Sequence, residues 1–148
     1  MYRAYIKNLE DLELAYEEIP HKGHFIYGNL IEGGNKSNTD AIVGDLIEVT
    51  DEYINTEWWC SIEKGSAEQY TGLKDYNGKE IYVGDIVKSS YKYAQPKISQ
   101  VIMECGNSYI LGEDLATGNE MLVSDHVNEI EVIGNVHMNL DLLEVNHD

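Results

Sequence analysis

The stretch from Gln69 to Lys88, QYTGLKDYNGKEIYVGDIVK, constrains the fold of this chain more than any other. It has a β-prone start at Gln69–Thr71, a turn signal at Asp75–Gly78 and a second break at Gly84-Asp85. In an Asn-Gly pair both residues tolerate positive φ, and the turn they form twists as paired strands do. We therefore predict an antiparallel hairpin around Asn77-Gly78, and at Gly84 a conformation that suits no residue with a Cβ.

The rest of the chain alternates short apolar runs with turn residues. Leu9, Leu12, Tyr16 and Ile19 recur at three- and four-residue steps, which predicts an amphipathic helix that ends at Pro20. The β-rich runs are Met1–Ile6, Phe25–Ile31, Ala41–Val49, Tyr53–Ile62, Ile98–Glu104, Tyr109–Leu111, Glu120–Val123 and Glu129–Val136. A final helical turn at His137–Glu144 is expected to face Leu140, Leu142 and Leu143 toward the core. Short strands with frequent turn signals favour a barrel or sandwich over βαβ units.

A four-residue pattern, apolar-Gly-Asx-apolar, occurs four times. Its copies are YGNL from Tyr27, VGDL from Val43, VGDI from Val83 and IGNV from Ile133. Gly permits a bend and the Asx side chain bonds nearby amides, so we expect each copy to start or kink a strand. A row of metal-binding carboxylates is the alternative interpretation, and we consider it the weaker one.

Charge and cysteine content limit the function classes. The 148 residues include 27 acidic and 10 basic side chains, a formal charge of −17. Such a surface repels phosphate backbones and anionic membranes and favours cationic partners or plain solubility. The two cysteines, Cys60 and Cys105, form no disulfide framework, and we expect both to be small buried residues. With no leader-like or membrane-spanning apolar run, we expect a cytoplasmic protein.

The central stretch resembles the YopX-like family of phage and prophage proteins. The residues that match the family motif include Gln69, Tyr70, Gly72, Asn77, Gly78, Gly84 and Asp85, followed later by Ile133-Gly134-Asn135 and Leu142-Leu143. Two positions depart from it, because Leu140 stands where the family often has Pro and Lys64-Gly65 where an Asp-Pro-Glu run is usual. The resemblance covers the chain from about Gln69 onward and is loose before it.

The resemblance implies a mainly β protein built around a small barrel of the Src-homology-3 type. We place an N-terminal helix and β-rich half at 1–64 and the barrel at 65–148, as one compact unit. The family's biochemical function is unassigned, so the resemblance supplies no catalytic residue and no cofactor. We expect no enzymatic activity.

Other candidate sites are weak. His21 and His24 have compact spacing with Glu17 or Glu18, but two exposed histidines in a loop are commoner than a metal site. No serine has the context of a hydrolase nucleophile. Trp58 and Trp59 are adjacent, so on a strand their rings point to opposite faces. We expect the Leu9–Ile19 helix to cover the second indole; an exposed indole, as a partner contact or in a weak homo-oligomer, is the alternative.

Lys88, Tyr91, Lys92, Tyr93 and Lys97 form the one basic and aromatic cluster of the sequence. Its composition suits single-stranded nucleic acid, although the overall charge argues against such binding. The leading functional hypothesis is a phage or prophage accessory protein that binds a host or phage protein, with an acidic face able to mimic nucleic acid. The alternatives are a nucleic-acid-binding barrel that uses Lys88–Lys97 and, last, a metal-assisted enzyme.

Overall fold

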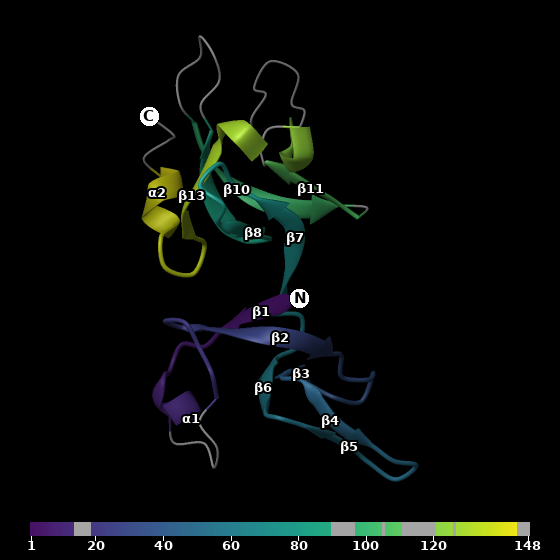
Figure 1. The fold of residues 1–148 in the computed structure, drawn as a ribbon. Helices are drawn as coiled ribbons and strands as arrows, with labels where there is room; N and C mark the ends of the chain where they lie inside the picture. Colours follow the sequence, from purple (N-terminus) through teal and green to yellow (C-terminus); the bar gives the residue numbers. More distant parts are fainter. Residues whose placement is uncertain (14–18, 90–96, 105, 111–120, 126, 145–148) are drawn as a thin grey trace. The chain divides into compact units, whose positions relative to one another are not determined.

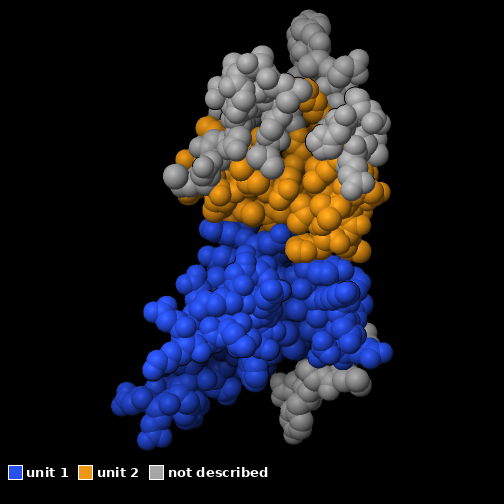
Figure 2. Space-filling view, turned by 180° about the vertical axis from the view of Figure 1, so that it is seen from behind, with its two compact units in different colours: residues 1–69 blue, residues 70–148 orange. Residues whose placement is uncertain are grey.

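The computed structural model describes residues 1–13, 19–89, 97–104, 106–110, 121–125 and 127–144. The chain forms two compact units, residues 1–69 and residues 70–148 (Figure 2). The helices are short and strands predominate in both units (Figure 1), so the mainly β class predicted from the sequence is confirmed.

Unit 1, residues 1–69, is an antiparallel sheet with a short helix. Its elements are β1 (Tyr2–Tyr5), α1 (Glu10–Glu13), β2 (Phe25–Ile31), β3 (Thr39–Val43), β4 (Leu46–Val49), β5 (Ile54–Thr56), β6 (Trp59–Glu63) and the first residues of β7 (Glu68–Lys74). The strands lie in the order β6-β3-β2-β1, and β1 also pairs with Glu68 and Gln69. Strands β4 and β5 form a separate two-stranded ribbon.

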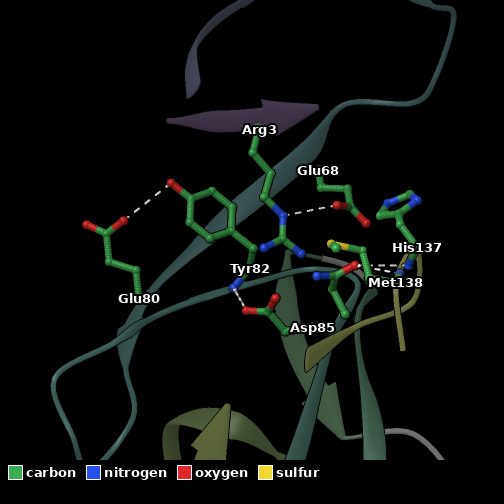
Figure 3. A network of polar contacts seen from close by, with 8 residues as sticks. Arg3, Glu68, Glu80, Tyr82, Asp85, His137 and Met138 are labelled. Atoms are coloured by element: carbon green, nitrogen blue, oxygen red, sulfur yellow. Dashed lines mark hydrogen bonds and ion pairs between the residues drawn. The ribbon is translucent and has the colours of Figure 1, made fainter. Parts of the chain in front are cut away.

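The core of unit 1 follows from strand alternation. Ala4, Ile26, Ile42 and Ile62 stack across four neighbouring strands, and Leu12 of α1 and Ile19 pack onto them. Asn8 caps α1 by accepting the N–H of Glu10 at 3.1 Å. The predicted helix thus begins as expected, and its continuation through Tyr16 lies outside the described residues. Arg3 is buried, with its guanidinium 3.0 Å from the Glu68 carboxylate (Figure 3) and above the Phe25 ring.

Unit 2, residues 70–148, holds the rest of β7 and a five-stranded antiparallel sheet. Its other elements are β8 (Glu80–Tyr82), β9 (Asp85–Ser89), β10 (Lys97–Glu104), β11 (Asn107–Ile110), β12 (Met121–Leu122), η1 (Val123–Asp125), η2 (Val127–Glu129), β13 (Ile130–Asn135) and α2 (Leu140–Glu144). The sheet order is β12-β11-β10-β9-β13, and β8 pairs with β7. A separate core forms here from Ile81, Val87, Val101, Ile110, Val123, Ile130 and Val132.

The described strands do not close into a barrel. Among the described residues no pairing joins the edge strands β12 and β13, so the sheet stays open. Strand β12 is two residues long, and the chain then turns into η1 and η2 instead of extending the ladder. Unit 1 ends at Gln69, five residues beyond the predicted domain boundary at 64/65, which remains a prediction.

The Asn77-Gly78 turn joins β7 and β8 antiparallel, as predicted. Gly78 has φ +83°, and the Asp75 carboxylate organises the turn by accepting the N–H groups of Asn77 and Lys79, each at 2.9 Å. Its other oxygen accepts the N–H of Val132 at 2.9 Å. A buried carboxylate with three backbone donors thus fixes the hairpin to β13.

Between β8 and β9, Gly84 has φ +91°, which confirms the strained position expected there. The following Asp85 is buried and accepts the Tyr82 N–H at 2.8 Å, while the Tyr82 hydroxyl bonds to Glu80 (Figure 3). The Gly-Asp pair therefore launches β9 in the way that the sequence predicts.

The other copies of the repeated pattern use Gly differently. A Cβ at Gly28 would lie 2.3 Å from the Val43 carbonyl, one at Gly44 2.5 Å from the Trp58 indole and one at Gly134 2.5 Å from the Asn139 side chain. These glycines allow close packing rather than a left-handed backbone. The expectation that each copy starts or kinks a strand holds at Gly44-Asp45, which precedes β4, and at Gly134, where the β13-β9 register shifts, and was wrong at Gly28, inside β2.

Candidate interaction surface

Large exposed apolar side chains concentrate on one segment of unit 1. Six of the eleven found among the described residues lie between positions 46 and 59, each 51–67% exposed. They are Leu46, Ile47, Val49, Tyr53, Ile54 and Trp59. Scattered exposed apolar residues need no explanation, but a cluster of this kind is a candidate interaction surface.

Five of these six residues belong to the β4-β5 ribbon and the turn that joins its strands. The predicted strands Ala41–Val49 and Tyr53–Ile62 are each interrupted, at Gly44-Asp45 and at Glu57-Trp58. Trp58 lies against Gly44, where a Cβ would collide with its indole. The inner parts of the predicted strands pair as β3-β6. The outer parts pair separately as β4-β5, which extends away from the sheet of unit 1 (Figure 1).

The pairing register assigns the ribbon side chains to two faces. Val49 lies opposite Ile54, and Leu46 lies opposite Thr56 across a bulge. Directly opposed residues share a face, and so do residues two apart along a strand. Leu46, Val49, Ile54 and Thr56 therefore form one face, which we call the apolar ribbon face.

The opposite face of the ribbon is more polar. Glu48 lies opposite Asn55, and its carboxylate accepts the Tyr53 hydroxyl at 3.0 Å. Thr50 closes the turn by bonding to the Tyr53 carbonyl through its N–H at 2.9 Å and by accepting the N–H groups of Glu52 and Tyr53. The ribbon is thus a defined hairpin whose apolar side lies in solvent.

The two tryptophans have different surroundings. Trp58 is half-buried against the unit 1 core, whereas Trp59 is 67% exposed. The expected cover over the second indole was therefore wrong. Adjacent strand residues point to opposite faces, and Cys60, next to Trp59 on β6, packs against the unit 1 core, so Trp59 faces away from that core.

A cavity of about 570 Å³ lies beside these tryptophans. Ile6, Asp11, Ile19 and residues 55–61 line it. Cys60, half-buried in its wall, packs against the core, and burial raises the pKa of its thiol, an effect that the Asp11 carboxylate reinforces. Because the thiolate is the nucleophilic form, this environment does not activate Cys60. Cys105 lies outside the described residues.

The remaining sequence candidates do not assemble into a site. The Nδ1 atoms of His21 and His24 lie 2.8 Å from the carbonyls of Gly23 and Ile6. In the part of the chain that the structure describes, no three His, Cys, Asp or Glu side chains gather to hold a metal. Leu140, expected in the core, is exposed at the start of α2, while Leu142 and Leu143 are half-buried.

Of the basic and aromatic cluster, only the two end residues lie within the described ranges. Lys88 is exposed on β9, and the register places Glu131 of β13 directly opposite it. Lys97 begins β10 opposite Ser89. Tyr91, Lys92 and Tyr93 lie outside the described residues, so the nucleic-acid hypothesis for this hairpin stays a prediction.

The motif residues of the central stretch shape the backbone. Gln69 pairs with Tyr2, Tyr70 stacks near Tyr82 with ring centroids 5.3 Å apart, and Gly72, at φ +82°, lies within an irregularity of β7. Burial raises the pKa of Tyr70, and the Glu80 carboxylate adds to the shift. We find no reactive group here. The motif residues of the central stretch thus determine turns and strand pairing. The apolar ribbon contains no motif, and its exposure was not predicted from the sequence.

Comparison with known proteins supports the fold and a family. A family model described as YopX protein matches residues 21–144. The crystal structure of protein EF1440 from Enterococcus faecalis is similar over 96% of each chain, with a TM-score of 0.55 and 24% sequence identity. No curated protein matches the chain. No helix among the described residues is long and apolar enough to cross a membrane.

Proposed function

The chain belongs to the YopX protein family, and on that premise we propose that it is a non-enzymatic protein-interaction module of phage or prophage origin. It acts in the cytoplasm of a bacterial host and binds a host or phage protein. The observation that carries this proposal is the apolar ribbon face, where Leu46, Val49 and Ile54 stand in solvent on one side of a hairpin.

The energetics of the ribbon favour a binding role over a structural one. An isolated two-stranded hairpin is marginally stable in water, and exposed apolar side chains gain nothing from folding unless something covers them. Burial of a side chain of this size stabilises a complex by roughly 1.5–3 kcal/mol, so three such residues suffice for an anchor. Trp59 adds a large aromatic group on the neighbouring edge strand.

The test is a comparison of partner capture by matched variants. The ribbon variant carries Leu46→Thr, Val49→Thr and Ile54→Thr, which place β-branched side chains at all three strand positions but remove the apolar surface. Ile31→Thr, also exposed and also on a strand of unit 1, is the control. Each chain is used as bait in a bacterial lysate, and any captured protein is then purified and titrated by calorimetry.

We expect a protein that binds the unaltered chain and the Ile31→Thr control equally and the ribbon variant at least about tenfold more weakly. Melting temperatures of all three chains should agree closely, since these side chains are exposed. If every captured protein binds the ribbon variant as tightly as the unaltered chain, the proposed function is wrong.

A further inference from the structure

All the charged residues around the apolar ribbon face are acidic. Between positions 45 and 57 the sequence has five carboxylates and no Lys or Arg. Four of them, which we call the rim carboxylates, are exposed at the two ends of the ribbon. Asp45 and Glu57 are paired at the base, where the Glu57 N–H bonds to the Asp45 backbone carbonyl at 2.9 Å, and Asp51 and Glu52 occupy the tip.

This arrangement sets an apolar centre between two negative ends. The fifth carboxylate, Glu48, lies on the opposite face, where it accepts the Tyr53 hydroxyl. A strand rises by about 3.3 Å per residue, so the base and tip carboxylates are about 20 Å apart along the ribbon. The surface therefore has a charge pattern with a defined spacing, and not merely a general acidity.

From this pattern we infer that the partner of the apolar ribbon face is a basic protein segment, with Lys or Arg flanking a short apolar run. The inference rests on the proposed function and names the chemistry of its partner. An extended segment meets both ends of the ribbon when its basic residues stand about six positions apart. Its apolar side chains then cover Leu46, Val49 and Ile54 while its cations pair with the carboxylates at the rim.

Charge complementarity also rejects the other occupants. A second copy of this chain would bring carboxylates against carboxylates, and like-charge contact opposes association. Duplex nucleic acid and anionic lipid surfaces are repelled for the same reason. The rim carboxylates give specificity for a basic partner, and burial of the apolar ribbon face provides the affinity.

The experiment is a selection from a random 12-residue displayed peptide library. The unaltered chain is the bait, and the ribbon variant with three threonines is used for counter-selection. We expect the enriched peptides to carry net positive charge, with Lys or Arg on both sides of an apolar run. One enriched peptide is then synthesised and its affinity measured at low and high salt.

A second variant tests the carboxylates alone. It carries Asp45→Asn, Asp51→Asn, Glu52→Gln and Glu57→Gln. Its control carries the same number of neutralised carboxylates elsewhere, at the exposed Glu10, Glu32, Glu63 and Asp141. We expect the rim variant to bind the peptide on the order of tenfold more weakly at low salt and the control to bind as the unaltered chain does.

The outcomes separate the two proposals. Enriched peptides that need the apolar ribbon face but are neutral or acidic, or equal binding by the rim variant, overturn this inference and leave the proposed function standing. If no peptide prefers the unaltered chain over the ribbon variant, both fall. Concentration-dependent sedimentation of the unaltered chain, absent in the ribbon variant, shows instead that a second copy is the occupant.

Discussion

At the scale of single residues, Gly84 gives the sharpest prediction. Its φ of +91° lies in a region that L side chains rarely adopt, and it is held there because its N–H bonds to the Val101 carbonyl and its own carbonyl accepts the Val136 N–H. Gly84→Val should therefore lower the free energy of unfolding by more than about 1 kcal/mol. Gly34→Ala is the matched control, because Gly34 has open space around it. Equal urea midpoints for the two variants would contradict the argument.

The paired tryptophans give a second prediction at this scale. Trp58 packs against the unit 1 core and over Gly44, so Trp58→Ala should lower the free energy of unfolding by about 2–4 kcal/mol. Trp59 is exposed, and Trp59→Ala should change it by no more than about 0.5 kcal/mol. Denaturant titration measures both losses. Comparable losses would mean that both indoles are buried in solution.

Residue types predict backbone conformation better than they predict close approach. Gly78 and Gly84 were recognisable because an Asn-Gly pair and a Gly-Asp pair make local demands on φ. Gly28, Gly44 and Gly134 are small because a carbonyl, an indole or an amide from elsewhere in the chain lies against them. The sequence next to each of these glycines does not indicate these contacts.

At the scale of elements, Asp40 ties two loops of unit 1 together. Its carboxylate accepts the N–H of Gly65 and that of Gly33, each at 2.8 Å, and Lys64 donates to the carbonyls of Gly33, Gly34 and Ser37. Lys64 and Gly65 together make this tie. The bond from Gly65, then that from Gly33, lowers the pKa of Asp40.

The lowered pKa of Asp40 makes the stability of the folded chain depend on pH. The pKa of Asp40 is lower in the folded chain than its ordinary value of about 4. The ionised carboxylate therefore stabilises the folded chain fully at a pH above that ordinary value. The contribution is lost as the pH falls through the folded pKa. Asp40→Asn should therefore melt below the unaltered chain at pH 7, and the gap should narrow in acid. Asp51→Asn, at the exposed ribbon tip, should show no such gap; a gap for Asp40→Asn that does not narrow as the pH falls would count against this account.

Element types were predictable where local chemistry decides them. The strands from Phe25, Ile98 and Glu129 lie within a residue or so of their predicted starts, because alternation and turn residues mark them. The β4-β5 ribbon was not predicted as a separate element, because its residues fall within the longer predicted strands Ala41–Val49 and Tyr53–Ile62. It separates from β3 and β6 where Trp58 lies against Gly44, a contact across the hairpin that a period-two pattern does not record.

At the scale of the whole molecule, each unit has its own buried apolar cluster. The β-rich class followed from turn spacing, but closure of a barrel depends on edge pairing between strands far apart in sequence. The candidate surface was unpredictable for a related reason. Leu46, Val49 and Ile54 are residue types usual in a buried strand, and only the folded structure shows that nothing covers them among the described residues.

The formal charge of −17 leads to the last prediction, on duplex DNA. Affinity for duplex DNA comes chiefly from cations that displace condensed counterions, and this chain has 10 basic residues against 27 acidic ones. At physiological salt, about 150 mM, a short labelled duplex should show no sub-micromolar binding by fluorescence anisotropy. A single-stranded oligonucleotide in the same assay tests the Lys88–Lys97 hairpin. Salt-sensitive, sub-micromolar binding of that strand, lost in Lys88→Ala, would replace the protein-binding proposal with a nucleic-acid one, because a local cluster would then have overcome the repulsion of the whole chain.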